Sequence, residues 1–426
     1  MSAGPISHEW LRSRRWFAGK SRPIEQLALA DQIALSADIT LAIVEVIYAA
    51  GPSERYSLAL PLDAFETSEC QQLLFRLLAE GAERGPVRFE PLVDLPREPG
   101  PSKPLGVEQS NTSIRYGRDW ILKLLRKVEF GENRDLEVGR FLTLEAKFPH
   151  TPRVAGAITY GGKATLGVLQ RFVENEGDGW TYVRGQLEEA PNAPDDVYWA
   201  QDGLPDREEP LLAQIEFLGC VTGEMHRALA SRPDLPDFAP EPCTQADLES
   251  WLTDLEAQRL RVLCHSELSE ESVPESRMLR FAQQDKVSKI QIHGDYHLGQ
   301  VLKTAAGFAI IDFEGEPARP LAERRAKQPA MRDVAGMLRS IHYAAWATAL
   351  ANPDHHLDAW AEDWARTAGD RFLKGWQETS SLPLDPDLLG LFQLAKAYYE
   401  LNYELNNRPD WVQVPLRGIE ALTRDA

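Results

Sequence analysis

The sequence predicts an α+β protein with a small N-terminal domain and two larger lobes. A strand-like run at Thr40–Tyr48 and a helical run at Cys70–Glu80 precede a stretch at 95–104 with four prolines. Because proline disrupts both helices and strand ladders, this stretch is interpreted as a linker. Residues 105–175 alternate short strand patterns with one helix, and helical periodicity dominates from about residue 211. The expected parts are an α+β domain at 1–95, an intermediate lobe at 105–175 and a helical lobe at 176–426.

Size and charge limit the classes of function. The chain has 426 residues, of which 43% are hydrophobic and 26% charged, a balance typical of globular proteins. This length exceeds one ordinary core, so several packed units are expected. The formal net charge of −19 argues against nucleic acid or an anionic membrane as the main partner.

Cysteine usage and hydropathy favour a cytoplasmic location. The four cysteines are scattered and form no CxxC pair, which suits a reduced compartment. The longest apolar stretch, Leu41 to Ala50, contains Glu45 and is too short to span a bilayer. We expect a soluble protein without a signal peptide.

The most informative segment runs from Ile290 to Glu314. A short β-type run leads into a loop that carries Asp295 and, five residues later, Gln300; a second apolar strand then ends at Asp312. Kinases need a carboxylate to accept the proton of the attacking hydroxyl and oxygen ligands to hold Mg²⁺. The spacing matches the HRDxxxxN and DFG segments of protein kinases, with glutamine in place of asparagine. The pattern predicts Asp295 as the base, and Gln300 and Asp312 as Mg²⁺ ligands.

A His-Gly-Asp triplet alone is more often a turn, because glycine and aspartate satisfy local backbone geometry. Two strand-loop carboxylates with an amide between them, at kinase spacing, favour the catalytic interpretation. We expect His293 and Glu314, which flank these residues, to contact the substrate.

A nucleotide site is predicted in the intermediate lobe. Lys123 lies within an apolar strand pattern, Trp120–Leu125, where a charge requires partners. Glu137, in a helical run fourteen residues later, is the preferred partner by analogy with the lysine–glutamate pair of kinases. Glu132 and Glu145 are alternatives, and Glu137 is otherwise a solvated helix residue.

Two further segments are expected to contact the nucleotide. A polar turn stands where kinases carry a glycine-rich loop, and its amides and hydroxyls suit phosphate oxygens, although most such segments are ordinary turns. It comprises Gln109, Ser110, Asn111, Thr112 and Ser113. The apolar run 169–173 is a candidate hinge for adenine, with Gln170, Phe172 and Val173 as contacts.

One face of a C-terminal helix is a candidate sugar site. Its polar and aromatic residues recur at helical spacing, whereas leucines occupy the opposite side. Carboxylates bind sugar hydroxyls and aromatic rings cover the apolar face of a pyranose. By periodicity alone, a solvated face with salt-bridging pairs is the commoner explanation. The residues are Lys396, Tyr399, Glu400, Tyr403, Glu404 and Asn407.

Assembled motifs resemble the maltokinase family, whose members have the bilobal protein-kinase-like fold of aminoglycoside phosphotransferases. The matches include Arg14–Lys20 (RRWFAGK), Glu108–Ser113 (EQSNTS), His293–Val301 (HGDYHLGQV), Ile311–Arg325 and Arg332–Ser340. The resemblance implies an N-terminal cap domain over roughly residues 1–95 and an ATP- and Mg²⁺-dependent reaction.

The same resemblance implies that maltose is converted to maltose 1-phosphate on a route from trehalose to α-glucan, with trehalose synthase as a possible partner. It also favours the 396–404 face as the maltose site. The alternatives are a kinase for glucosamine or an aminoglycoside, and a non-catalytic binding subunit of a trehalose-processing complex. Segments 31–100 and 175–290 carry few matching residues, so they leave the substrate-setting details open.

Overall fold

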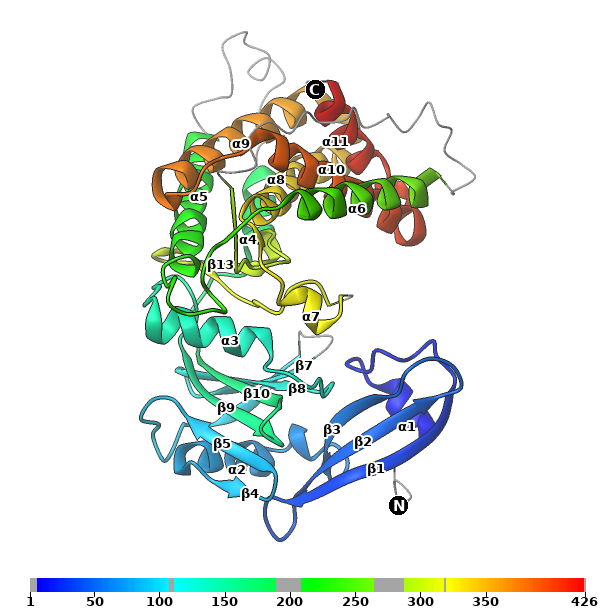
Figure 1. The fold of residues 1–426 in the computed structure, drawn as a ribbon, viewed down its shortest axis with the longest axis vertical. Helices are drawn as coiled ribbons and strands as arrows, with labels where there is room; N and C mark the ends of the chain where they lie inside the picture. The colour runs from blue at the N-terminus through cyan, green and yellow to red at the C-terminus, as the bar shows by residue number, and fades with distance from the viewer. Residues whose placement is uncertain (1–5, 107–110, 189–207, 264–286, 318, 425–426) are drawn as a thin grey trace. The chain divides into compact units, whose positions relative to one another are not determined.

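The computed structural model describes residues 6–106, 111–188, 208–263, 287–317 and 319–424 (Figure 1). The chain divides into two compact units. Unit 1 comprises Met1–Lys147 and Thr151–Glu174, and unit 2 comprises Phe148–His150 and Asn175–Ala426. Each unit is described by itself.

Unit 1 contains mostly strands. Its elements are α1 (His8–Ser13), β1 (Ile24–Ala34), β2 (Thr40–Tyr48), β3 (Glu54–Leu60), α2 (Ser68–Glu80), β4 (Glu83–Arg84), β5 (Val87–Pro91), β6 (Ser102–Leu105), β7 (Asn111–Tyr116), β8 (Trp120–Leu125), α3 (Arg134–Arg140), β9 (Val154–Tyr160) and β10 (Ala164–Arg171). The predicted strand at 40–48 and helix at 70–80 are confirmed as β2 and α2.

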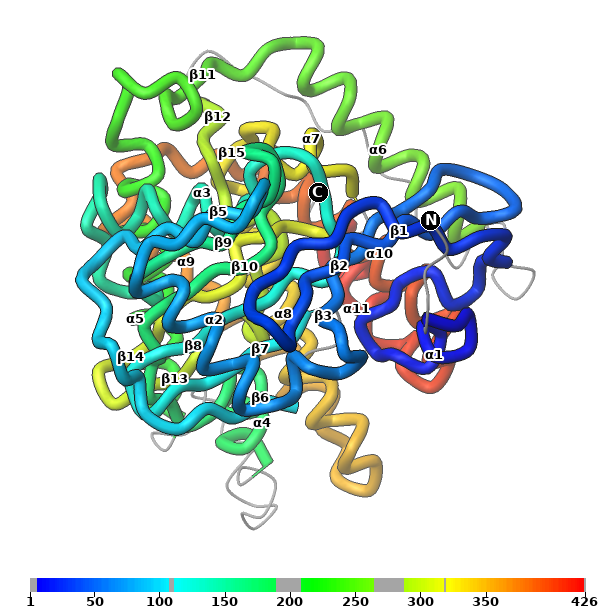
Figure 2. Tube along the Cα trace, turned by 90° about the horizontal axis from the view of Figure 1, so that it is seen from below, coloured from blue at the N-terminus to red at the C-terminus, as the bar shows by residue number. Residues whose placement is uncertain are grey.

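The N-terminal sheet is antiparallel, in the order β1-β2-β3 (Figure 2). Successive side chains of β2 point to opposite faces of the sheet, and side chains on both faces are buried. Val44 and Val46 pack with Phe17 near α1. Leu41 and Ile43 join the core on the other side.

A second sheet of seven antiparallel strands runs in the order β4-β5-β9-β10-β8-β7-β6. Its strands come from both sides of residue 95, since β4 and β5 precede this position and the others follow it. One core contains Phe65 and Leu74 from the N-terminal segment together with Leu122 and Leu169 from the later strands. The segments before and after residue 95 therefore fold around shared apolar contacts.

The interpretation of 95–104 as a linker is wrong at its C-terminal end. Ser102–Leu105 forms β6, which pairs with β7 and places Pro104 opposite Ile114. Because β6 is the last strand of the sheet, the missing N–H of a proline costs no hydrogen bond on the unpaired side of this strand. A proline-rich stretch is therefore compatible with an edge strand as well as with a connection.

Unit 2 is mainly helical. Its elements are α4 (Gly179–Glu188), α5 (Glu209–Leu229), β11 (Glu241–Pro242), α6 (Gln245–Leu263), β12 (Ser288–Ile290), β13 (Val301–Thr304), β14 (Gly307–Ile310), α7 (Leu321–Arg324), β15 (Gln328–Pro329), α8 (Met331–Ala351), α9 (Asp358–Ser380), α10 (Pro386–Asn407) and α11 (Gln413–Arg424). Among the described residues, no helix combines the length and apolar character needed to cross a membrane.

Helices α5 and α9 pack with their backbones in close approach. A Cβ atom at Gly219 of α5 would overlap the carbonyl of Phe372, and a Cβ atom at Gly375 of α9 would overlap the carbonyl of Glu216. Glycine is required at both positions because a side chain would force the helices apart. The same helix α5 supplies His226, which contacts Asp333 of α8.

We predict that Gly219→Ala and Gly375→Ala each destabilise the protein by about 1–3 kcal/mol, since the added methyl group overpacks a helix contact. Thermal denaturation should show a lower Tm for both variants. Gly390, in α10, is the control because a Cβ atom added there would have no heavy atom within 4 Å outside its own helix backbone and chain neighbours. Gly390→Ala should raise the Tm, since alanine favours a helix by about 0.5–1 kcal/mol. Unchanged Tm values for the first two variants would contradict the close packing.

Candidate active site

The predicted catalytic base lies on a loop between two secondary structure elements. The loop follows β12 and ends in a 3₁₀ turn, Leu298–Gln300, directly before β13. Gly294 has a φ of 88°, a backbone conformation that glycine adopts without strain. Asp295 follows it with a half-buried side chain. The turn thus presents a carboxylate at the start of a β-hairpin formed by β13 and β14.

A buried carboxylate from α8 holds this loop. Asp333 accepts hydrogen bonds from the backbone N–H groups of His293 (2.6 Å) and Gly294 (2.9 Å). Although burial alone would raise the pKa of Asp333, hydrogen bonding with His226 and the nearby histidines hold it below its ordinary value. A charged acceptor makes stronger hydrogen bonds than a neutral one. Asp333 therefore fixes the backbone immediately before Asp295.

His226 of α5 completes the support of Asp333. The indole N–H of Trp376 donates to His226 Nδ1 at 2.9 Å, and an indole nitrogen is only a donor. His226 Nδ1 is therefore the acceptor, so Nε2 carries the proton and donates to Asp333 Oδ2 at 3.1 Å. This chain of hydrogen bonds runs from α9 through α5 to the loop that carries Asp295, and sequence reasoning did not find it.

His293 is fully buried within the loop. Its Nε2 donates to the carbonyl of Ile311 at 2.8 Å, and its Nδ1 accepts from the backbone N–H of Asp295 at 3.3 Å. Burial lowers the pKa of His293 below its ordinary value, consistent with a neutral ring. Both ring nitrogens are thus engaged within the protein, one of them by the backbone of Asp295. A contact between His293 and a substrate, as the sequence predicted, would require this arrangement to open.

Lys396 of α10 lies beside the predicted base. Its Nζ is 3.6 Å from Asp295 Oδ1 and 3.8 Å from Glu316 Oε1. Burial opposes its charge, but the carboxylates of Asp295, Glu316 and Glu400 raise the pKa of Lys396 above its ordinary value. A cation therefore lies next to the carboxylate that was assigned as the base.

The residues predicted to hold Mg²⁺ are on neighbouring segments of unit 2. The backbone N–H of Ile311 donates to the carbonyl of Gln300 at 3.0 Å, which holds Gln300 close to the start of the loop that carries Asp312. Asp312 has a φ of 66°, a rare conformation for a non-glycine residue and one that is frequent at functional sites.

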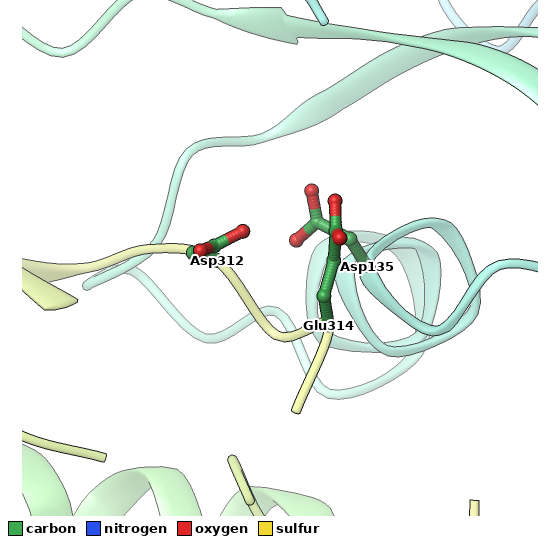
Figure 3. Close-up of side chains that lie close together, drawn as sticks. All are labelled: Asp135, Asp312 and Glu314. Atoms are coloured by element: carbon green, nitrogen blue, oxygen red, sulfur yellow. The ribbon is translucent and has the colours of Figure 1, made fainter. Parts of the chain in front are cut away.

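Glu314 stands beside Asp312 on this loop. Their carboxylates contain oxygen atoms within 4.8 Å of each other (Figure 3). Clustered carboxylate oxygens are the ligands that hard divalent cations prefer, so the donor set fits Mg²⁺. Glu314 was predicted to contact the substrate; its position gives it the chemistry of a further metal ligand. Asp135, also labelled in Figure 3, belongs to α3 of unit 1.

In unit 1, Lys123 occupies the middle of β8 as predicted. Its Nζ lies 3.7 Å from Asp135 Oδ2, in the first turn of α3. Asn133 caps this helix by accepting the N–H groups of Asp135 and Leu136 at 2.9 and 3.3 Å. Glu137, the partner preferred from the sequence, is buried on the same helix. Sequence reasoning missed Asp135, although a recognised Asn133 cap places it in the first turn.

The expected phosphate turn is partly a strand. Gln109 and Ser110 lie outside the described residues, whereas Asn111, Thr112 and Ser113 begin β7. The prediction of a turn is therefore wrong for these three residues, because they pair with the end of β8. The Thr112 hydroxyl accepts from Arg126 Nε at 2.9 Å.

The predicted hinge lies at the end of β10. Gln170 pairs with Ile121 of β8, and Phe172 follows the strand. The Arg115 guanidinium lies over the Phe172 ring at 3.8 Å from its centroid. Val173 is half-buried at the edge of unit 1.

The candidate sugar face lies on α10 and borders two cavities of unit 2. A cavity of about 540 Å³ is lined by Lys396, Tyr399, Glu400, Tyr403 and Glu404, as the sequence predicted for one face. The aromatic residues Trp180, Tyr343 and Trp411 also line it. Sequence reasoning missed these three, since they are far from α10 in the chain or follow its end. Asn407 ends α10 and does not line this cavity.

Both glutamates of this face are paired with arginine. Arg339 of α8 donates to Glu400 Oε2 through two nitrogens at 3.0 and 2.8 Å. Glu404, only 2% exposed, accepts from the Tyr343 hydroxyl at 3.1 Å and from Arg408 Nε at 2.8 Å. These carboxylates are therefore neutralised within the protein.

A second cavity, of about 360 Å³, is lined by Asp295 and Tyr296 of the loop that follows β12. It shares Gly336, Lys396 and Tyr399 with the first cavity. The two cavities therefore adjoin at these three residues.

The fold and these motifs define a class. A mostly β unit with a half-buried strand lysine, followed by a helical unit with an aspartate loop and a β-hairpin that leads to a second aspartate, is a protein-kinase-like fold. The fold class predicted from the sequence is confirmed, including the N-terminal cap: residues 10–81 match the maltokinase N-terminal cap domain.

Known proteins narrow this class to one family. The chain is 30% identical over 333 residues to a glucosamine kinase of Streptacidiphilus jiangxiensis, covering 72% of this chain and 70% of that protein. A solved glucosamine kinase has the same fold, with a TM-score of 0.70, 22% identity and 96% coverage of each chain. Another, in complex with glucosamine, ADP and inorganic phosphate, has a TM-score of 0.69 at 22% identity, covering 98% of this chain and 99% of that one. The protein belongs to this family of sugar kinases with a maltokinase-type cap.

We predict that Asp333→Asn lowers kcat about 100-fold, because a loss of loop position on the order of 1 Å has this effect. The amide can accept through only one oxygen, so at least one loop N–H loses its partner. The KM for nucleotide should change less than about two-fold, since Lys123 lies in unit 1. Steady-state kinetics would measure both constants.

Asp370→Asn, an exposed position on α9, is the control and should retain full activity. A kcat for Asp333→Asn equal to that of the control would show that the loop holds its position without this carboxylate.

Proposed function

We propose that the protein is an ATP-dependent maltokinase, which transfers the γ-phosphoryl group to the anomeric hydroxyl of maltose and forms maltose 1-phosphate. The observation that carries this proposal is the pair of cavities that meet at Lys396. One contains the carboxylate assigned as the base, and the other has an aromatic lining. A disaccharide has two rings to occupy such a pair, whereas a monosaccharide has one.

Charge pairing supports a neutral sugar. In the larger cavity, Glu400 and Glu404 are engaged by Arg339 and Arg408. Asp178 in its wall accepts the N–H of Thr181 at 2.7 Å. An amino sugar carries a cation that needs a carboxylate partner, and the carboxylates that line this larger cavity already have partners, so a neutral ring suits this cavity. Hydroxyl groups and apolar ring faces suit this lining better.

In the proposed reaction, Asp295 orients the acceptor hydroxyl and accepts its proton. Lys396 holds that carboxylate in place at 3.6 Å. Lys123 contacts the nucleotide phosphates, and Glu137 or Asp135 positions the lysine. Mg²⁺ would be held by Gln300, Asp312 and Glu314, and it supplies charge neutralisation at the phosphates. The protein contributes mainly position and electrostatics to a phosphoryl transfer.

Other predicted contacts remain part of the proposal. The segment Gln109–Ser113 contacts phosphate oxygens, and the segment that contains Gln170, Phe172 and Val173 contacts adenine. Maltose is supplied by isomerisation of trehalose, and trehalose synthase is the partner that this chemistry suggests. The proposed location is the cytoplasm.

Glucosamine is the second candidate substrate. The named relatives are glucosamine kinases, and one of them was solved with glucosamine and ADP. A single hexosamine ring would occupy only the cavity that contains Asp295. Both candidate reactions would use the same catalytic residues, so only the activity with each acceptor sugar distinguishes them.

We predict ATP consumption by the purified protein with Mg²⁺ and maltose, and little or none with glucose, glucosamine or trehalose. An acid-labile phosphate on the product would identify the anomeric position. Turnover with glucosamine but not with maltose would support the kinase chemistry and contradict the assignment of maltose as the substrate. A lack of turnover with all four sugars would favour a binding subunit.

We predict that Asp295→Asn lowers kcat by about 10²–10⁴-fold, the usual contribution of a general base. Nucleotide affinity, measured by isothermal titration, should remain near that of the unmodified protein. Asp234→Asn, at an exposed position of unit 2, is the control. Full turnover by Asp295→Asn would mean that another group accepts the proton.

A further inference from the structure

We propose that helix α6 forms a wall of the acceptor site and binds hydroxyl groups of the reacting sugar ring through Asp254 and Gln258. This inference rests on the proposed function, because it names further residues that hold the same acceptor. No residue between 245 and 263 had been assigned a role from the sequence. This region contains few motif matches. Its proximity to the loop that carries Asp295 is visible only in the structure, where both line one cavity.

Helix α6 presents one stripe of residues to the cavity that contains Asp295. Asp254, Ala257, Gln258 and Arg261 line it, at spacings of three and four that lie on one side of a helix. A different stripe, which includes Trp251 and the residues Leu248, Leu255 and Val262, is buried. The helix is therefore amphipathic, with a cavity-facing side that is mostly polar.

Three contacts fix α6 in this position. Thr244 and Asp247 form a capping box: the Thr244 N–H donates to Asp247 at 2.8 Å, and the Asp247 N–H donates to the Thr244 hydroxyl at 3.2 Å. Lys289 of β12 donates to the same Asp247 at 2.9 Å, close to the start of the catalytic loop. Trp251 packs edge-on against Phe392 of α10, with ring centroids 5.3 Å apart.

These contacts join α6 to the two elements that border the acceptor. Strand β12 leads to Asp295, and α10 carries Lys396 and Tyr399. Helix α6 is thus held in a fixed position relative to Asp295 and to the candidate sugar face of α10. A side chain on α6 can contact a ligand without a change of fold.

The polar groups of this stripe retain hydrogen-bonding capacity. Asp254 is attracted by Arg319 and Arg332. Within the part of the chain that the structure describes, however, no ion pair within 4 Å engages it. The oxygen of Gln258 accepts from Arg261 only at 3.5 Å, the outer limit of a hydrogen bond. The cavity wall therefore offers acceptor oxygens and an amide donor.

The charge balance of the cavity indicates the class of ligand. Four basic side chains line it, and four acidic side chains oppose them: Arg261, Arg319, Arg332 and Lys396 against Asp254, Asp295, Glu316 and Asp333. A lining with many donors and acceptors but no net charge suits a neutral polyhydroxyl compound better than an anion or a cation. A hexose ring has this chemistry.

The experiment compares Asp254→Ala and Gln258→Ala with controls on the same helix, Glu249→Ala and Gln245→Ala, whose positions are exposed and outside the cavity. Steady-state kinetics with maltose and ATP, and titration of each protein with maltose, are the measurements. Each cavity variant should raise the KM and Kd for maltose about ten-fold, the effect of one lost hydrogen bond. The KM for ATP should stay within about two-fold, and the controls should match the unmodified protein.

The outcomes separate this inference from the proposed function. An unmodified protein that phosphorylates maltose, with cavity variants that keep its sugar KM and Kd, would overturn the role of α6 alone. An equal rise in the KM for ATP, or an equal effect in the controls, would mean a structural role and would also overturn it. If the unmodified protein neither phosphorylates nor binds maltose but acts on glucosamine, the substrate proposal fails; the same variants then test α6 with glucosamine. Absence of any sugar binding overturns both.

Discussion

The loop that carries the proposed base depends on one buried carboxylate, that of Asp333. It accepts two backbone N–H groups of the loop before Asp295 and a third hydrogen bond from His226. An isolated buried carboxylate is costly, but three donors satisfy its oxygens. Since α5, α8 and α9 all contribute to this arrangement through His226, Asp333 and Trp376, the helical packing of unit 2 determines the loop geometry. The glycine contacts between α5 and α9 also fix this helical packing.

The sequence predicted the parts of the fold that have strong local signals. Strands β2 and β8 and helix α2 were all visible as periodicity. The aspartates at 295 and 312 drew attention because their spacing matches that of kinase motifs. These features depend on residues close together in the chain.

Other features depend on contacts between distant residues and left no local signal. Ser102–Leu105 reads as a proline-rich connection, and only its neighbour β7 makes it a strand. Asp135 lies near Lys123 because a helix start returns to a strand twelve positions away in the sequence. The burial of His293 and the pairing of Glu400 with Arg339 also require tertiary structure. Amphipathic periodicity indicated a polar face on α10, but it could not show that the glutamates are already neutralised.

The core shared by the two sheets of unit 1 has a consequence for how this protein can be divided or joined to others. Phe65 and Leu74 from the maltokinase-type cap pack with Leu122 of β8 and Leu169 of β10. Strands β4 and β5 also extend the later sheet at β9. A cut at residue 95 would expose apolar side chains and an unpaired strand edge, both of which promote aggregation. When the chain is divided or fused to another protein, the cap and the seven-stranded sheet must therefore be kept together.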